Sequence, residues 1–85
     1  MINLAITDDQ VIILKGLQKI LADVPNIKVS GVYNNGEELL EGLAREQPDV
    51  LLLDIQMPGK SGIELAAIIT KTYRNIKIIA HYTLL

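Results

Sequence analysis

Short apolar segments alternate along this chain with stretches in which apolar residues recur at helical spacing. The segment Val50–Leu53 contains four consecutive apolar residues, a pattern typical of a strand buried on both faces of a parallel sheet. A loop with proline and glycine follows, so Asp54 stands at the carboxyl end of this strand. The other predicted strands are Ile2–Ile6, Ile27–Tyr33 and Ile76–Tyr82.

Amphipathic helices are predicted between these strands. The first begins near Gln10, with Asp9 as its expected N-cap, and Pro25 ends it. The other two span about Gly36 to Glu46 and Ile63–Thr72. Strands and helices therefore alternate throughout, which favours right-handed crossovers and a single α/β domain with one parallel sheet between flanking helices.

Composition narrows the classes of protein that this chain can represent. With 85 residues, 49% of them hydrophobic, the chain can build one core. A net charge of −2 with interspersed signs gives no basic patch for nucleic acid or for anionic membranes. The absence of cysteine excludes a disulfide framework, and no long apolar run indicates a membrane span or a signal peptide. We therefore expect one cytoplasmic domain.

Acidic residues follow two of the predicted strands. Asp8 and Asp9 come after the first strand, and Asp54 comes directly after the third. Ligands of open α/β sheets bind at the carboxyl ends of the strands, so we expect these carboxylates to share one site if the two strands are neighbours. Oxygen ligands in an open, hydrated site suit Mg²⁺, and the backbone carbonyl of Gln56 is a further candidate ligand.

A carboxylate beside a divalent cation is suited to phosphoryl transfer. Asp54 is the better nucleophile candidate, because the turn at Met57-Pro58-Gly59 holds its loop, and its attack would form an acyl phosphate. A purely structural turn aspartate is the simpler alternative. A metal-dependent aspartyl-phosphate phosphatase is another, but such enzymes usually need a second acid where this chain has Gln56. A non-phosphorylated interaction module is the third.

The pair Asp8-Asp9 and the run DIQMPGKSGIE at Asp54–Glu64 resemble the receiver domain of two-component response regulators. The stretch DDQVIILKGLQKIL further resembles the subclass whose output is a helix-turn-helix DNA-binding domain. The resemblance implies a flavodoxin-like sheet with strand order 2-1-3-4. It also implies Asp54 as the phosphoacceptor, Asp8 and Asp9 as the acidic pocket for Mg²⁺, and a sensor histidine kinase as the partner. Control of transcription would belong to an output domain outside this chain.

On this resemblance, residues 1–85 are a partial receiver domain that is incomplete at its C-terminal end. A receiver continues with a fifth strand whose lysine contacts the phosphoryl group, and no lysine follows the predicted fourth strand here. The hydroxyl residue that changes its position when a receiver is phosphorylated is expected near Tyr82, and we favour its neighbour Thr83. His81 is expected to be incidental. An inert fragment is therefore an alternative to a working switch.

The predicted fourth strand, Ile76–Tyr82, lies at the edge of the expected sheet. Without a fifth strand, its outer backbone groups lack partners and one of its faces lacks a covering helix. Exposed edges of this kind tend to pair with other chains, so we expect a homodimer or a swapped oligomer through this strand.

Overall fold

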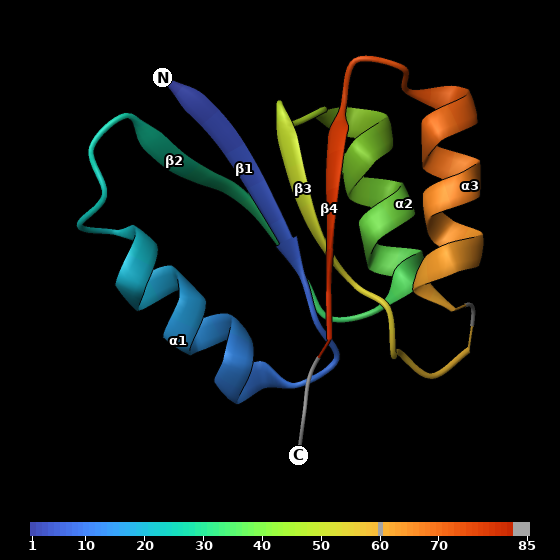
Figure 1. Ribbon diagram of the computed structural model, residues 1–85, viewed down its shortest axis with the longest axis horizontal. Helices are drawn as coiled ribbons and strands as arrows, with labels where there is room; N and C mark the ends of the chain where they lie inside the picture. Colours follow the sequence, from blue (N-terminus) through green and yellow to red (C-terminus); the bar gives the residue numbers. More distant parts are fainter. Residues whose placement is uncertain (60, 83–85) are drawn as a thin grey trace.

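The computed structural model describes residues 1–59 and 61–82, in which strands and helices alternate along the chain (Figure 1). The strands are β1 (Ile2–Thr7), β2 (Ile27–Tyr33), β3 (Val50–Asp54) and β4 (Lys77–His81). The helices are α1 (Val11–Leu21), α2 (Gly36–Arg45) and α3 (Gly62–Thr72). None of these helices is long and apolar enough to cross a membrane. The predicted alternation of strands and helices is confirmed.

The strands form one parallel sheet in the order β2-β1-β3-β4, which confirms the predicted order 2-1-3-4. β1 lies inside the sheet and pairs with both β2 and β3. In the register of β1 with β3, Thr7 lies opposite Leu53. In the register of β3 with β4, Asp54 lies opposite His81. Because all pairs are parallel, the carboxyl ends of the strands meet at one edge.

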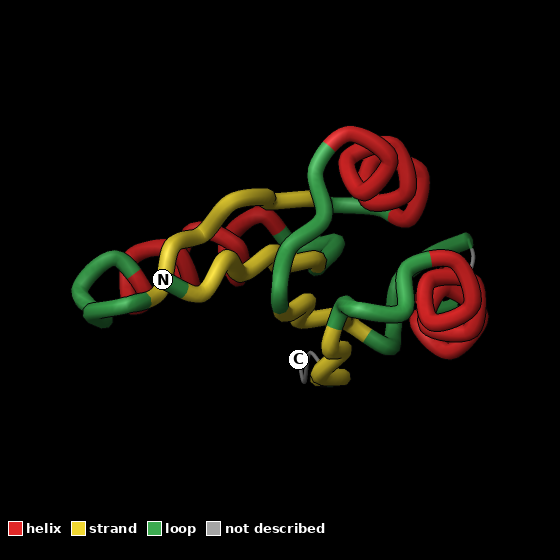
Figure 2. Tube along the Cα trace, turned by 90° about the horizontal axis from the view of Figure 1, so that it is seen from above, coloured by secondary structure: helices red, strands yellow, loops and turns green. Residues whose placement is uncertain are grey.

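Helices cover both faces of this sheet (Figure 2). α1 packs on one face, where Leu14 is buried against Leu4 and Ile6. α2 and α3 pack on the other face, over a larger buried cluster of Ala5, Leu39, Leu43, Leu51, Leu53, Leu65 and Ile69. Alternate residues of β3 point to opposite faces, so Val50 and Leu52 pack toward α1. This double burial explains why the segment is apolar without alternation.

The strand boundaries differ slightly from the prediction. β1 extends to Thr7 and β3 extends to Asp54, because both residues continue the ladder with a neighbouring strand. β4 is one residue shorter at each end than predicted. Strand β3 therefore includes the aspartate that the sequence places just beyond it.

The prediction that Asp9 is the N-cap of the first helix is wrong. Gln10, and not Asp9, holds the cap position of α1, and its side chain makes no capping hydrogen bond. Asp8 Oδ1 instead accepts the Gln10 backbone N–H at 2.9 Å. The preceding aspartate thus closes the turn into α1, whereas α2 and α3 have side-chain caps at Asn35 and Ser61.

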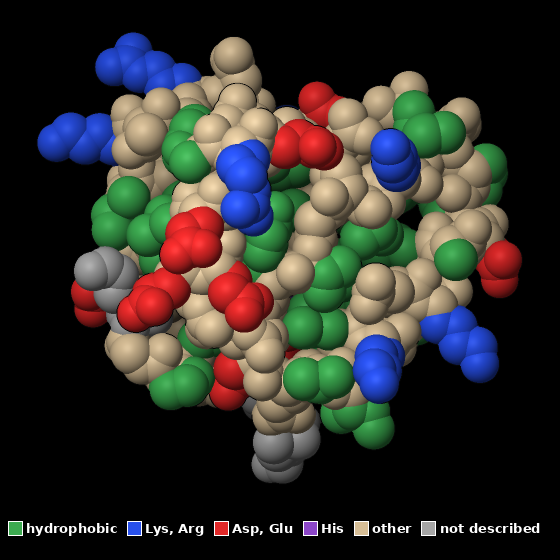
Figure 3. Space-filling model, turned by 180° about the vertical axis from the view of Figure 1, so that it is seen from behind, with side chains coloured by type: hydrophobic (Ala, Val, Ile, Leu, Met, Phe, Trp, Pro, Cys, Tyr) green, Lys and Arg blue, Asp and Glu red, His purple; other side chains and the backbone are tan. Residues whose placement is uncertain are grey.

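Acidic side chains gather on the face of the molecule seen in Figure 3. On α2, Glu37, Glu38 and Glu41 are all exposed, opposite the buried residues Leu39 and Leu43. The acidic cluster of this helix is therefore its solvated face.

β4 lies at an edge of the sheet. Among the described residues it pairs only with β3. Ile79 is 48% exposed, although it lies opposite the half-buried Leu52 of β3. The described part of the chain therefore presents the apolar edge strand that the sequence predicts.

Gly62 begins α3 at a point where the backbone passes close to the end of β3. A Cβ atom at this position would lie 2.5 Å from the carbonyl oxygen of Asp54 and 2.5 Å from Cα of Ile55. Both are backbone atoms, so Gly62→Ala forces the loop to shift. We expect the substitution to lower the free energy of unfolding by about 1–3 kcal/mol in a urea titration.

Gly16→Ala is the matched control. Gly16 lies inside α1, and a Cβ atom there would meet no described heavy atom within 4 Å beyond the backbone of its own helix. Because alanine favours helix more than glycine does, this change should raise the free energy of unfolding by about 0.5–1 kcal/mol. Equal effects of the two substitutions would contradict the close approach at Gly62.

Candidate functional site

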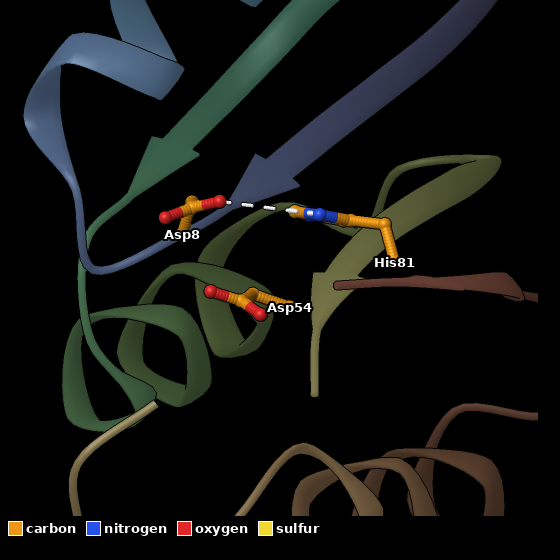
Figure 4. A group of neighbouring side chains, drawn as sticks. All are labelled: Asp8, Asp54 and His81. Carbon is orange, nitrogen blue, oxygen red and sulfur yellow. Dashed lines mark ion pairs between the residues drawn. The ribbon is translucent and has the colours of Figure 1, made fainter. Parts of the chain in front are cut away.

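Polar side chains from three neighbouring strands meet at the carboxyl edge of the sheet. Asp8 follows β1, Asp54 ends β3 and His81 ends β4. Each offers a ligand atom, and these atoms all lie within 4.8 Å of one another. Figure 4 shows the three side chains converging from their separate strands. Asp8 and Asp54 are both 0% exposed, whereas His81 is half-buried.

Backbone amides of two loops hold the carboxylates. The Gln10 N–H donates to Asp8 Oδ1 at 2.9 Å, and the Gln56 N–H donates to Asp54 Oδ1 at 3.0 Å. Both bonds join an aspartate to the amide two residues later, which is the geometry of an Asx turn. Each carboxylate is thus fixed relative to its own loop, and the pairing of β1 with β3 determines how close the two lie.

The loop after β3 is tied to the neighbouring elements. The Ile55 N–H donates to the carbonyl of His81 at 2.9 Å, and the Gly62 N–H donates to the carbonyl of Ile55 at 3.0 Å. The loop that carries Asp54 is therefore linked on one side to the end of β4 and on the other to the start of α3.

His81 lies beside the acidic pair, although its position near the end of the sequence gave it no expected role. Its Nε2 lies 3.2 Å from the carbonyl oxygen of Thr7, and its Nδ1 lies 3.9 Å from Asp8 Oδ2. The strand order could have predicted the place of His81. Once β4 lies beside β3, the residue at the end of β4 must lie near Asp54.

The remaining predicted site residues lie outside this group of three. Asp9 is half-buried, and Gln56 is exposed with its N–H bound to Asp54. Metal ligation by the Asp9 carboxylate and by the Gln56 carbonyl stays a prediction. Thr83, the predicted switch residue, lies outside the described residues, and its neighbour Tyr82 is 64% exposed.

The donor set fits a divalent cation. Two ionised carboxylates from adjacent strands repel each other, and the repulsion is strong where both are buried. A cation between Asp8 and Asp54 offsets this repulsion. Carboxylate oxygens are ligands that Mg²⁺ prefers, so the two aspartates are suited to hold it.

The fold and the site together define a class of protein. It is a doubly wound α/β domain with an acidic site at the carboxyl edge of its sheet, where the strand order reverses around β1. A family model described as the response regulator receiver domain matches residues 4–82. This chain belongs to that family, whose members act in two-component signal transduction and are generally not conventional enzymes.

Curated relatives are longer than this chain. Response regulator GacA from Pseudomonas viridiflava is 34% identical over 80 residues, which are 94% of this chain and 37% of GacA. Response regulator UvrY from Escherichia coli K12 is 35% identical over 79 residues, which are 93% of this chain and 36% of UvrY. The chain thus spans little more than a third of the length of these relatives.

Solved structures of RcsB from Salmonella enterica serovar Typhimurium share the fold. RcsB bound to promoter rprA in the presence of phosphomimetic BeF3⁻ is 28% identical, with a TM-score of 0.91. The match covers 100% of this chain and 72% of that chain. The isolated REC domain of RcsB with BeF3⁻ is 29% identical, with a TM-score of 0.90, and the match covers 98% and 62% of the two chains. RcsB was solved bound to a promoter, so the predicted resemblance to DNA-binding response regulators is confirmed.

Proposed function

We propose that this chain is the phosphoacceptor part of a cytoplasmic two-component switch, in which Asp54 accepts a phosphoryl group. The observation that carries the proposal is the burial of Asp54 beside Asp8 at the carboxyl edge of the sheet, inside the region that the family model matches. The proposed donor is a sensor histidine kinase, and the proposed readout is a transcriptional output domain.

The reaction needs a nucleophile and charge neutralisation. A carboxylate oxygen of Asp54 attacks the phosphorus of a phosphohistidine, a P–O bond forms, and the P–N bond breaks with its electron pair leaving on the imidazole. Asp8 and Asp54, with the Asp9 carboxylate and the Gln56 carbonyl, would hold Mg²⁺. When bound, the ion neutralises charge on the transferred oxygens.

The linked loops offer a route from phosphorylation to a changed surface. A phosphoryl group adds negative charge at Asp54, next to the buried Asp8. The loop after Asp54 is bonded to the end of β4 through the Ile55 N–H and the His81 carbonyl. New charge at Asp54 would therefore shift both segments together, with Thr83 as the candidate switch residue beyond them.

The amide side chain of Gln56 disfavours the alternative function as a phosphatase. Two residues after Asp54, where such a phosphatase places a proton-donating acid, this chain has the amide Gln56. An amide cannot supply the proton that the leaving group needs. A phosphoryl group on Asp54 is therefore expected to persist as a signal.

Intact-mass spectrometry tests phosphorylation directly. After incubation with Mg²⁺ and acetyl phosphate, the wild-type chain should gain the mass of one phosphoryl group, and Asp54→Asn should gain none. Asp23→Asn is the matched control, because Asp23 is exposed in the turn after α1 and the same substitution there should leave phosphorylation intact. An unmodified wild-type chain would leave the non-phosphorylated interaction module or the inert fragment as the explanation.

We further infer that a second copy of the chain covers the edge strand β4. The strand pairs only with β3 among the described residues, and it carries the exposed apolar side chains of Ile79 and Ala80. Unpaired edge groups beside apolar side chains favour strand addition or exchange. The expected product is a homodimer or a swapped oligomer.

Size-exclusion chromatography with light scattering at micromolar concentrations tests this association. Wild type should have the mass of a dimer or a larger assembly, and Ile79→Lys should be a monomer, because a charge on an edge strand opposes pairing. Ile12→Lys is the matched control, since Ile12 is 77% exposed on α1, away from the edge. A wild-type chain that is strictly monomeric would refute association through β4.

A further inference from the structure

We propose that His81 adds a nitrogen ligand to the pocket of Asp8 and Asp54, so that the pocket binds Co²⁺ or Zn²⁺ more tightly than Mg²⁺. The inference deepens the cation site of the proposed function and rests on that site, but it does not depend on phosphoryl transfer. The ligand atoms of Asp8, Asp54 and His81 all lie within 4.8 Å of one another.

The hydrogen bond at one ring nitrogen orients the other toward the pocket. The Thr7 carbonyl oxygen, 3.2 Å from His81 Nε2, can only accept, so Nε2 carries the proton in this bond. In the neutral imidazole, Nδ1 then presents its lone pair. A ring N–H donated to a backbone carbonyl is the usual arrangement that fixes a metal-binding histidine.

The distance from Nδ1 to the nearer aspartate fits two ligands of one ion. His81 Nδ1 lies 3.9 Å from Asp8 Oδ2. Metal bonds to histidine nitrogen and carboxylate oxygen are about 2.0–2.2 Å, so two ligands of one ion lie at most about 4.4 Å apart. Figure 4 shows the imidazole and the carboxylate of Asp8 directed toward each other, with Asp54 beside them.

The identity of the third donor changes the preferred metal. Carboxylate and water oxygens suit Mg²⁺, whereas an imidazole nitrogen suits first-row transition metals. The affinity of a mixed nitrogen and oxygen site rises from Mn²⁺ through Co²⁺ and Ni²⁺ to Cu²⁺. Half-buried His81 therefore strengthens the preference of this pocket for transition metals beyond what its two aspartates alone would give.

Calorimetric titration of the 85-residue chain with Co²⁺ and, separately, with Mg²⁺ tests the ligand role of His81. Wild type should bind Co²⁺ more tightly than Mg²⁺. The His81→Gln variant should bind Co²⁺ at least about tenfold more weakly than wild type, while its Mg²⁺ affinity changes little. Equal Co²⁺ affinity in the wild type and the variant would overturn the proposal.

The chain contains one histidine, which gives a second measurement on the wild type alone. Diamagnetic Zn²⁺ should shift the NMR signals of the His81 ring up to one equivalent of metal, and Mg²⁺ should leave them in place. Ring signals that do not move at saturating Zn²⁺ would overturn the proposal, even if His81→Gln failed to fold.

A relocated histidine is the matched control. In the double variant His81→Gln with Asn75→His, the imidazole moves to the exposed turn before β4. This variant should bind Co²⁺ as weakly as His81→Gln does. Recovery of wild-type affinity would show that an imidazole anywhere on the surface suffices, and would overturn the proposal.

The metal titrations use no phosphoryl donor, so they separate this inference from the proposed function. A chain that binds Co²⁺ through His81 but gains no phosphoryl mass supports the metal site and contradicts the phosphoacceptor role. A chain that is phosphorylated on Asp54 but shows no dependence of Co²⁺ binding on His81 overturns only the nitrogen ligand.

Discussion

Parallel pairing of β1 with β3 is the interaction on which the site depends. Its register aligns Thr7 with Leu53, so the next residue along each strand, Asp8 or Asp54, reaches the same edge of the sheet. Helices cover both faces of the sheet, and both carboxylates are 0% exposed. A slip of one residue in this register would turn every side chain of one strand to the opposite face and separate the pair.

Burial makes the two neighbouring carboxylates of Asp8 and Asp54 favour a bound cation. Two carboxylates that would each be well hydrated on the surface instead lie close together, held by the amides of Gln10 and Gln56. Removing charge from water is costly, and like charges add to the cost, so the native state gains from a bound cation. In the proposed function, the same cation would neutralise charge during phosphoryl transfer to Asp54, which would link the stability of the fold to that chemistry. His81 completes the pocket from β4.

Local patterns in the sequence predicted the strands and the acidic residues at their ends, whereas the strand order 2-1-3-4 is what the resemblance to receiver domains implies. The apolar run Val50–Leu53 indicates a strand buried on both faces of the sheet, and ligands of such sheets bind at the carboxyl ends of the strands. The N-cap prediction at Asp9 is wrong because Asp8 and Asp9 are chemically equivalent, and only the loop geometry determines that Asp8 accepts the Gln10 N–H. The place of His81 depends on the pairing of β4 with β3, a long-range property that local spacing does not contain.

The most direct measurement is the free energy of unfolding in urea as a function of Mg²⁺ concentration. A ligand that binds only the native state stabilises it increasingly as its concentration exceeds the dissociation constant. The wild-type free energy of unfolding should therefore rise with the logarithm of Mg²⁺ concentration, and Asp8→Asn should lose most of that rise. A wild-type free energy of unfolding that is independent of Mg²⁺ would contradict a cation site between Asp8 and Asp54.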